Sequence, residues 1–454
     1  MDYNEFIKTK RYNNVESGFA PDSINANAKP HQKAIIQWAC KRGKAAIFAD
    51  TGLGKTFMQL EWARQVATKN IKPVLLLAPL AVGKQTEKEA EKFDIDASVK
   101  YTREPDHAYD IQITNYEMLD RFNPSDYSGI VLDESSILKG QTGAYRKALT
   151  EFAANIPYRL SCTATPSPND FMELGTQCEF LGVMSQVEML AMFFTHDGSE
   201  TQKWRLKGHA SLKFWEWLST WAVVISSPAD LGFDGSEYDL PPLKIDTVIL
   251  KSDDKNGLFA DVARGLTDVR SAKKKSVHDR VKACADWVNS LDEPCLIWCE
   301  SNEESDLLTS AINGAVEVAG NHKQEIKEDR LLGFADGKYT KLVSKASIAG
   351  FGMNYQIANK MAFVAPTYSF EQFYQAVRRE WRFGQARDVT VKVFMTENLV
   401  GVHEVMLSKL DNDKLMRKEM INVMSESMKK EIIGAKAIKT DYEPKSNATI
   451  PAFL

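Results

Sequence analysis

The stretch AAIFADTGLGKT, residues 45–56, joins two patterns that together decide the local fold. Its first half is a short apolar run with the length of a buried strand, and the segment after it, TFMQLEWARQVA, has the spacing of a helix. Gly52 and Gly54 lie between the two and allow the backbone to turn tightly. The sequence therefore predicts a strand, a glycine-rich turn and a helix in direct succession.

The turn nearly matches the pattern of a phosphate-binding loop, G-x-x-x-x-G-K-[ST]. Ala49 stands where the first glycine is usual, and this position needs only a small residue. Backbone N–H groups of such a turn, together with the N-terminus of the following helix, face an anion. Lys55 would reach the β- and γ-phosphates of ATP, and the Thr56 hydroxyl would bind Mg²⁺. The residues expected to hold the nucleotide here are Thr51, Gly52, Gly54, Lys55 and Thr56.

An acidic pair downstream supports the phosphate loop over the alternative of an ordinary glycine turn. GIVLDESS, residues 129–136, is an apolar strand that ends in Asp133 and Glu134. Alone, such a pair is often only a solvated strand end. ATPases, however, place a Mg²⁺-binding aspartate there, and the adjacent glutamate can act as general base on the attacking water. We therefore expect Asp133 to bind the metal together with Thr56, and Glu134 to be the base.

Short apolar runs alternate with amphipathic stretches in two parts of the chain. The first part holds VLLLAP (74–79), IQITNY (111–116), GIVLDE (129–134) and YRLSCTAT (158–165). The second part holds PCLIWCE (294–300), AVEVAG (315–320), YTKLVSK (339–345), KMAFVAP (360–366) and VTVKVFM (389–395). The alternation predicts a parallel sheet flanked by helices in each part, and hence an α/β fold with two lobes.

The alternation breaks between about 176 and 245, where the chain is rich in aromatic residues. Phe214, Trp217 and Trp221 recur at helical spacing, which is more typical of a core than of a base-stacking platform. We expect five parts: a polar extension (1–28), an ATP-binding lobe (29–175), a helical insertion (176–245), a second lobe (246–405) and a Lys-rich helical tail (406–454).

Composition limits the classes of protein to consider. The formal net charge of -4 means that any nucleic-acid contact must come from local patches. The six cysteines form no C-x-x-C pair, which argues against zinc and fits a reducing cytoplasm. The polar start is no signal peptide, and no apolar run approaches the ~20 residues of a membrane span. A cytoplasmic protein without membrane contact is expected.

The motifs in this order resemble those of superfamily 2 helicases, and among these the chromatin-remodeller-like (Swi/Snf-type) DNA-dependent ATPases. They look especially like the compact DEAD/DEAH-like versions found in phages and prophages. The resemblance covers about residues 28–400. It implies two tandem RecA-like lobes, with ATP in the cleft between them and the helical, aromatic-rich insertion joining them.

In the first lobe the resemblance assigns roles to further motifs. PHQKAIIQWA (30–39) is similar to the adenine-recognition segment, with Gln32 on the adenine edge; a surface glutamine in a first helical turn is the alternative. The segments at 78–93 and 113–119 resemble those that touch the nucleic-acid backbone, and SCTATPSPND (161–170) resembles the motif that couples hydrolysis to movement. The residues concerned are Pro79, Thr114, Asn115, Thr163 and Thr165.

In the second lobe, SKASIAGFGMNYQIANK (344–360) resembles a nucleic-acid or coupling motif that contains Gly350, Gly352 and Asn354. QAVRREWRFGQ (375–385) fits the pattern Q-x-x-x-R-x-x-R-x-G-Q. Its spacing of three predicts Arg379 and Arg382 on one face of a helix, where they could stabilise γ-phosphate charge as arginine fingers in cis. Gln375 would contact the nucleotide, and a solvated basic helix face is the alternative reading.

The resemblance implies a DNA helicase or translocase that hydrolyses ATP to ADP and phosphate with Mg²⁺. Lys139 after DESS favours duplex DNA, held by backbone contacts without sequence specificity. One alternative is an RNA helicase of the same superfamily. Another is the ATPase subunit of a phage replication, recombination or nuclease assembly with little unwinding of its own. The cell would then be a bacterium or a phage-infected host.

Overall fold

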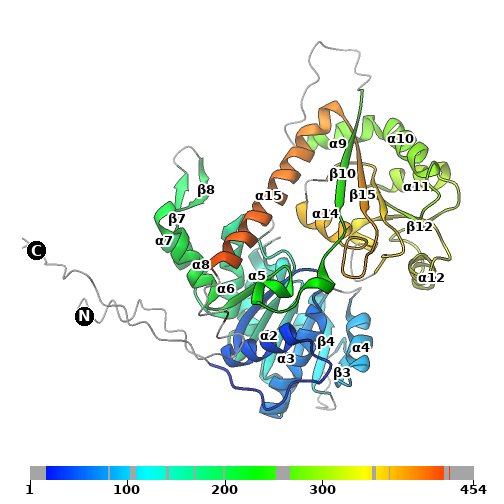
Figure 1. Ribbon diagram of the computed structural model, residues 1–454. Coiled ribbons are helices and arrows are strands. Elements are labelled where there is room, and N and C mark those ends of the chain that lie inside the picture. The colour runs from blue at the N-terminus through cyan, green and yellow to red at the C-terminus, as the bar shows by residue number, and fades with distance from the viewer. Residues whose placement is uncertain are drawn as a thin grey trace, which may run out of the picture.

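The computed structural model describes residues 17–79, 82–102, 109–139, 143–167, 170–197, 200–251, 266–349, 354–367, 369–423 and 429. They form two α/β lobes joined by a linker (Figure 1). Each lobe is built on one parallel sheet, so the expected fold class is confirmed. Within the described part of the chain, no helix combines the length and the hydropathy that a membrane span needs.

The sheet of the first lobe has seven parallel strands in the order β3-β4-β2-β5-β6-β1-β9. Along the chain they are β1 (Lys44–Ala49), β2 (Val74–Ala78), β3 (Ala97–Val99), β4 (Ile111–Asn115), β5 (Gly129–Asp133), β6 (Tyr158–Cys162) and β9 (Ala222–Ile225). Most are buried at every position because helices cover both faces of the sheet.

Successive residues of β1 enter different cores. Ala45 and Ile47 pack with α2 (Pro30–Arg42) and α3 (Lys55–Asn70), whereas Phe48 packs with α6 (Leu174–Leu181) and α8 (Ser211–Ser219) on the opposite face. The remaining helices of this lobe are α4 (Gly83–Lys92), α5 (Gly143–Ala153) and α7 (Gln186–Phe193). This layering leaves the carboxyl ends of the strands, where the loops carry the motifs, at one edge of the lobe.

The sheet of the second lobe has six parallel strands in the order β10-β15-β14-β11-β13-β12. The strands are β10 (Leu243–Leu250), β11 (Cys295–Cys299), β12 (Ala315–Val318), β13 (Lys341–Lys345), β14 (Lys360–Phe363) and β15 (Val389–Thr396). The helices are α9 (Leu266–Lys275), α10 (Val277–Asn289), α11 (Asn302–Ala311), α12 (Gln324–Ala335), α13 (Ala346–Ala349) and α14 (Phe370–Val377).

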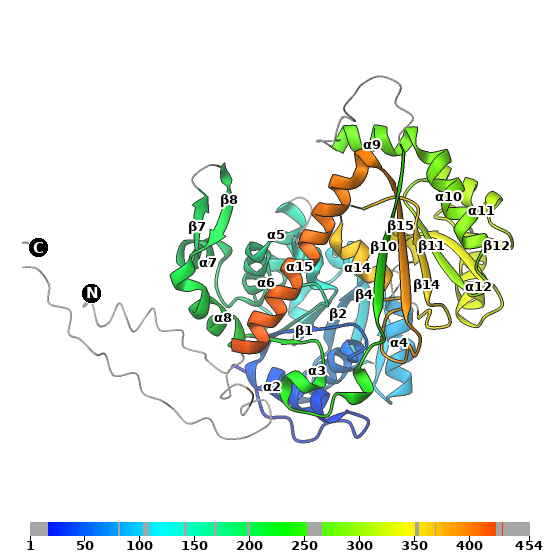
Figure 2. The same cartoon turned by 45° about the horizontal axis from the view of Figure 1, so that its top comes forward.

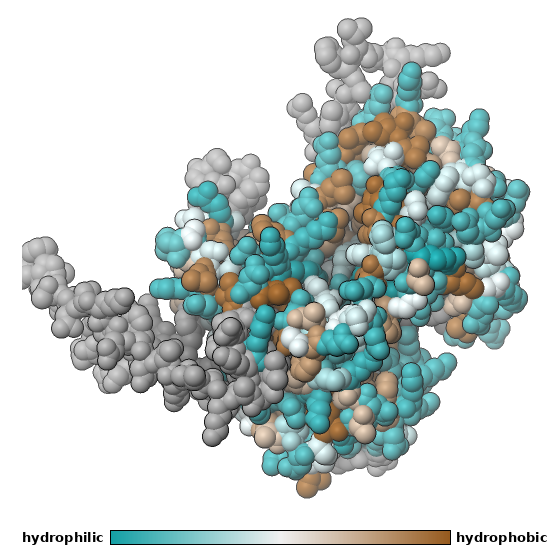
Figure 3. All heavy atoms as spheres, viewed as in Figure 1, coloured by the Kyte–Doolittle hydropathy of each residue, from teal (hydrophilic) through white to brown (hydrophobic). Residues whose placement is uncertain are grey.

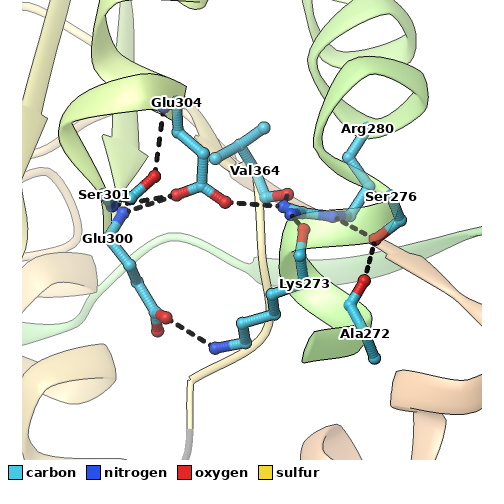
Figure 4. Close-up of polar contacts among 8 residues, drawn as sticks. All are labelled: Ala272, Lys273, Ser276, Arg280, Glu300, Ser301, Glu304 and Val364. Atoms are coloured by element: carbon cyan, nitrogen blue, oxygen red, sulfur yellow. Dashed lines mark hydrogen bonds and ion pairs between the residues drawn. The ribbon is translucent and has the colours of Figure 1, made fainter. Parts of the chain in front are cut away.

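A buried ion pair fixes α10 to α11 in this lobe (Figure 4). Arg280 and Glu304 lie 2.9 Å apart with almost no exposed surface. The guanidinium also donates to Ser276 Oγ and to the Lys273 and Val364 carbonyls, and the carboxylate accepts from the N–H groups of Glu300 and Ser301. This network satisfies the buried charges and orients the start of α11 against the end of β14.

The segment between the lobes contributes to the first lobe in two ways. Its strand β9 is the edge strand of the first sheet and pairs with β1 in parallel. Phe214, Trp215, Trp217 and Trp221 are all buried in the core of that lobe, so the expectation of a core role for the aromatic stripe is confirmed. A two-stranded hairpin, β7 (Phe194–Asp197) with β8 (Glu200–Leu206), projects from the same side of the lobe (Figure 1).

The helix α15 (Val400–Val423) runs from the second lobe back to the first (Figure 2). Near its start Val402 and Met406 belong to the core of the second lobe. Near its end Met416 and Met420 belong to the core of the first lobe, beside α8 and β9. The helix therefore connects the cores of the two lobes. The division of the chain into the five expected parts stays a prediction.

The molecular face shown in Figure 3 is largely hydrophilic, with apolar patches of which the most prominent lies at the top of the second lobe. All six cysteines are buried as free thiols. Burial raises the pKa of each of them well above the ordinary value, so they are inert at neutral pH.

Candidate active site between the two lobes

The predicted phosphate loop joins β1 to α3, as the strand–turn–helix pattern requires. Gly52 and Gly54 have positive φ angles of 95° and 79°. A Cβ on Gly54 would lie 2.3 Å from Gln32 Nε2, and one on Gly52 would lie 2.9 Å from the Phe383 Cβ of the second lobe. The positive φ therefore favours glycine at both positions, and at Gly52 the contact with the Phe383 Cβ adds a steric reason. Lys55 opens α3, and its Nζ donates to the Ala49 carbonyl at 2.9 Å.

Gln32 lies on the loop in this structure. Its Nε2 donates to the Leu53 carbonyl at 3.1 Å, and its Oε1 accepts from the Lys29 N–H at 3.0 Å. The rings of Tyr238 and Phe383 are 4.8 Å apart nearby, and the Lys29 ammonium lies 4.9 Å from the Tyr238 ring. Gln32 therefore lies close to a cationic and aromatic surface. Its contact with adenine stays a prediction.

The acidic pair lies at the end of β5, next to the loop. Gln59 Nε2 donates to Asp133 Oδ1 at 2.8 Å, and the Tyr116 hydroxyl donates to the Asp133 carbonyl at 2.6 Å. Glu134 has a φ of 55°, a left-handed conformation that a non-glycine residue rarely adopts. Such backbone strain is typical of residues whose side chain must be held in one direction.

The electrostatics of the pair fit a catalytic carboxylate. Burial raises the pKa of Glu134 to about 7, although nearby Lys55 lowers it. Burial likewise raises the pKa of Asp133, against the Gln59 hydrogen bond. Burial lowers the pKa of Lys55, while the carboxylates of Glu134, Asp50 and Asp133 raise it. The side chains predicted from the two motifs thus share one electrostatic site.

The predicted coupling threonines connect directly to Glu134. The Thr163 hydroxyl donates to Glu134 Oε2 at 3.1 Å, and the Thr165 N–H donates to Thr163 Oγ1 at 3.0 Å. Both threonines have no exposed surface. The segment after β6 therefore contacts the expected catalytic base without an intermediate residue.

The arginine-bearing segment of the second lobe faces this site, but its local structure corrects one prediction. Because α14 ends at Val377, Arg379 and Arg382 lie in turns and do not share a helix face. Arg379 is buried, its Nε donates to the Gln375 carbonyl at 3.0 Å, and burial lowers the pKa of its guanidinium to about 10. Burial also lowers the pKa of Arg382, whose Nε has no hydrogen-bond partner among the described residues.

Arg378, which the motif pattern leaves unassigned, makes polar contacts from this segment to the loop. Its Nη2 donates to the Thr51 carbonyl at 2.6 Å and lies 3.1 Å from Asp50 Oδ1. Tyr374 on α14 donates to the same carboxylate oxygen. Two features of the sequence could have indicated this contact: a third arginine beside the two predicted ones, and an acidic residue inside the loop. Gln59, one helical turn after Lys55, was also missed.

A second contact between the lobes involves the residue that distinguishes DESS. The Ser136 hydroxyl donates to Glu371 Oε1 at the start of α14. Behind it, Gln177 Nε2 donates to the Ser135 carbonyl at 2.8 Å. The acidic motif of the first lobe is therefore linked to the helix that precedes the arginines.

The predicted nucleic-acid residues are distributed over both lobes. In the first sheet Ala78 pairs with Asn115, so Pro79 follows directly beside Thr114 and Asn115 at the carboxyl edge. Both of these side chains are buried, and Thr114 Oγ1 and Asn115 Oδ1 have no hydrogen-bond partner among the described residues. In the second lobe Asn354 is exposed and donates to Gln356 Oε1 at 3.1 Å. Gly350 and Gly352 lie outside the described residues.

The second lobe also has a pocket of about 350 Å³ at the carboxyl ends of its strands. Its lining combines polar groups with aromatic rings, namely Cys299, Glu300, Lys345, Ser347, Thr367, Gln372, Trp298, Phe363 and Phe373 among others. Glu300 is held there by Lys273 at 2.5 Å (Figure 4).

A family model described as "Type III restriction enzyme, res subunit" matches residues 25–168. The matched range begins just before α2 and ends just after Thr165. It therefore contains the phosphate loop, the acidic pair and the coupling threonines of the first lobe.

Two yeast proteins are similar to part of the chain. TATA-binding protein-associated factor MOT1 of Saccharomyces cerevisiae is 26% identical over 193 residues, which cover 36% of this chain and 10% of MOT1. Helicase SWR1 of Candida albicans is 28% identical over 191 residues, which cover 37% of this chain and 12% of SWR1. The chain thus corresponds to a small part of the length of these relatives.

Among solved structures, the SWI2/SNF2 ATPase core of Sulfolobus solfataricus in complex with dsDNA is similar at 19% identity. The superposition covers 92% of this chain and 99% of that chain, with a TM-score of 0.41. The α/β fold is shown by the two parallel sheets themselves. With the motifs in order on these two lobes, the sequence matches support the similarity of the chain to superfamily 2 helicases of the Swi/Snf type.

Proposed function

We propose that the chain is a motor that hydrolyses ATP in the cleft between its lobes and moves along DNA. One observation carries the proposal: the loop and acidic pair of the first lobe meet the arginine-bearing segment of the second. Phe383 packs against Gly52, and Arg378 donates to the Thr51 carbonyl. Groups suited to a nucleotide therefore approach one site from two bodies that can move relative to each other.

The residues of the first lobe fit a nucleoside triphosphate. The loop from Thr51 to Gly54 presents backbone N–H groups at the N-terminus of α3, where an anion is favoured. Lys55 lies within the same site and would bind the β- and γ-phosphates. Thr56 and Asp133 would hold Mg²⁺, which neutralises charge on the phosphate oxygens when it is bound.

Glu134 is the proposed general base. A carboxylate with a pKa of about 7 accepts a proton from water more readily than an ordinary glutamate and is still substantially ionised at neutral pH. Thr163 orients it through the hydrogen bond at 3.1 Å. Since Thr163 belongs to the segment that resembles a coupling motif, a change at the base would be transmitted to that segment.

Arg379 and Arg382 are the proposed charge-stabilising groups. Arg379 is buried and Arg382 is half-buried, and both lie in the turns that follow the loop-contacting Arg378. A guanidinium can donate several hydrogen bonds to phosphate oxygens, and its effect increases in a site from which water is excluded. Gln375, buried on α14 and bonded through its carbonyl to Arg379, would set their position.

The proposed track is DNA, in agreement with the similarity to SWR1, which is named a helicase, and to MOT1. Duplex DNA is favoured only by the resemblance of the motif sequences to those of remodeller-like ATPases. The phage or bacterial setting is also a proposal, since both of these relatives are yeast proteins. An RNA track and a dependence on a partner assembly are the competing forms of the same motor.

The test is ATP hydrolysis by the purified protein with no nucleic acid, single-stranded DNA, duplex DNA or RNA. The variant Lys55→Ala serves as the blank. Stimulation by DNA above the other conditions is expected. Stimulation by RNA alone would replace the DNA motor by an RNA helicase, and a rate that equals the blank in all four conditions would contradict the motor reading of this chain on its own.

A further inference from the structure

The phosphate loop contains an acidic side chain of its own, Asp50, directly after β1. Although burial raises the pKa of Asp50, the charges of Arg378 and Arg417 hold it below the ordinary value, so this carboxylate is ionised. A carboxylate in a loop built for polyphosphate repels the ligand unless a cation compensates it. The compensation comes from the other lobe.

Arg378 is that cation. It is 2% exposed, and its Nη2 lies 3.1 Å from Asp50 Oδ1 while donating to the Thr51 carbonyl at 2.6 Å. Tyr374 donates to the same carboxylate oxygen, and the Thr51 N–H donates to it at 2.6 Å. The guanidinium is 4.9 Å from the Trp381 ring. A planar cation with its aromatic and carbonyl partners in place is well fixed.

Two further nitrogen atoms of the Arg378 guanidinium are hydrogen-bond donors. Its Nε and Nη1 are buried and have no hydrogen-bond partner among the described residues. Buried donors of this kind are expensive to leave unpaired. A direct contact of these donors with phosphate is therefore the competing explanation of Arg378, and the first test below separates it from a contact that acts through Asp50.

The same network reaches the coupling segment through α15. Arg417 donates from Nε to Asp413 at 2.8 Å and from Nη2 to the carbonyl of Ala164, the residue between the two coupling threonines. Its guanidinium lies 6.0 Å from the Tyr374 ring. Asp50 is therefore the point at which the loop, α14 and α15 converge.

We propose that Asp50 and Arg378 form an interlobe clamp that positions the phosphate loop against the second lobe. Arg378 acts as a positioning residue: it cancels the carboxylate inside the loop and fixes the loop carbonyl at Thr51. The clamp rests on the proposed function, since it gives the ATP site a nucleotide-sensitive closure. The clamp predicts that adding Asp50→Asn to Arg378→Gln lowers the KM for ATP again. An independent contact of Arg378 with phosphate predicts no such recovery.

The first test measures the KM for ATP in wild type, Arg378→Gln, Asp50→Asn and the double variant. Arg378→Gln removes the cation in contact with the carboxylate and leaves Arg417 as the other compensating charge, and a rise of about tenfold in KM is expected. Adding Asp50→Asn removes the repelling charge, so the double variant returns to the smaller KM of Asp50→Asn alone. A double variant worse than Arg378→Gln would overturn the clamp. Arg378→Lys keeps the charge and should recover part of the loss.

The second test does not need hydrolysis. Because the native cysteines are buried, dyes can be attached to cysteines placed at the exposed Lys69 of the first lobe and Glu325 of the second. Energy transfer without nucleotide should fall in Asp50→Asn and in Arg378→Gln. It should stay unchanged in Arg387→Gln, which removes an exposed arginine bonded to the Ile357 carbonyl. Unchanged transfer in both clamp variants would refute the clamp even if the protein hydrolysed no ATP.

Discussion

The Thr163 hydroxyl donates a hydrogen bond of 3.1 Å to Glu134, although Thr163 follows β6 and Glu134 follows β5. The bond favours the ionised form of the glutamate, whose pKa burial otherwise raises to about 7. The coupling segment and the proposed base are thus one unit, and a change in either should be visible in the other.

Replacing Thr163 by valine should shift the pH profile of ATP hydrolysis. Removal of the hydroxyl takes away a contact that lowers the pKa of Glu134, so that pKa rises. Because the base acts when ionised, activity increases with pH through this pKa, and the acidic limb of the kcat profile should move to higher pH. Thr165→Val is the matched control, since the Thr165 hydroxyl has no hydrogen-bond partner among the described residues.

Replacing Glu134 by glutamine should reduce kcat by roughly 10²–10⁴-fold while ATP binding persists, as expected for loss of a general base. Binding can be followed with a fluorescent ATP analogue and turnover by phosphate release. Glu117→Gln changes an exposed glutamate in the same lobe and should leave both unchanged. Near-normal turnover in Glu134→Gln would remove this residue from the mechanism.

Replacing Gly54 by alanine should damage both stability and nucleotide binding. The new Cβ meets Gln32 Nε2 at 2.3 Å, and the φ of 79° costs a non-glycine residue roughly 1–2 kcal/mol. Thermal unfolding should show a lower Tm than wild type. In Gly208→Ala the added Cβ meets nothing within 4 Å, so a similar loss of stability there would show that the effect is not local to the loop.

Replacing Met416 by alanine should lower the free energy of unfolding by about 2–5 kcal/mol, because the side chain is fully buried in the first lobe. Chemical denaturation measures the loss. Leu415→Ala, one residue away but 52% exposed, should change stability by less than about 0.5 kcal/mol. Equal effects in the two variants would contradict the packing of α15 on the first lobe.

The sequence predicted the loop and the acidic pair because each is a local pattern. A strand, two glycines and Lys55 in succession can form few other structures, and Asp133 follows a buried run. Parallel strands place such ends at one edge of a sheet, so their meeting followed from the fold class. Thr163, which follows the neighbouring strand β6, was predicted from the resemblance of its segment to a coupling motif.

The arginines were harder because their contacts depend on where α14 ends. A helix continued through the motif would bring Arg379 and Arg382 to one face, but it ends at Val377. The turn that follows directs Arg378 to the loop, and no periodicity in the sequence reports this. The short strand β9 was missed for a similar reason: four apolar residues after an aromatic helix look like its continuation.

The packing of α15 has a consequence for how the chain is made. The core of the first lobe includes Met416 and Met420, which are synthesised long after Trp217 and Trp221 with which they share that core. At roughly 5–20 residues per second, the nascent lobe waits on the order of ten seconds or more for its last helix. During that interval the part of this core that Met416 and Met420 cover is exposed, so it is where binding by a chaperone during translation would first be sought.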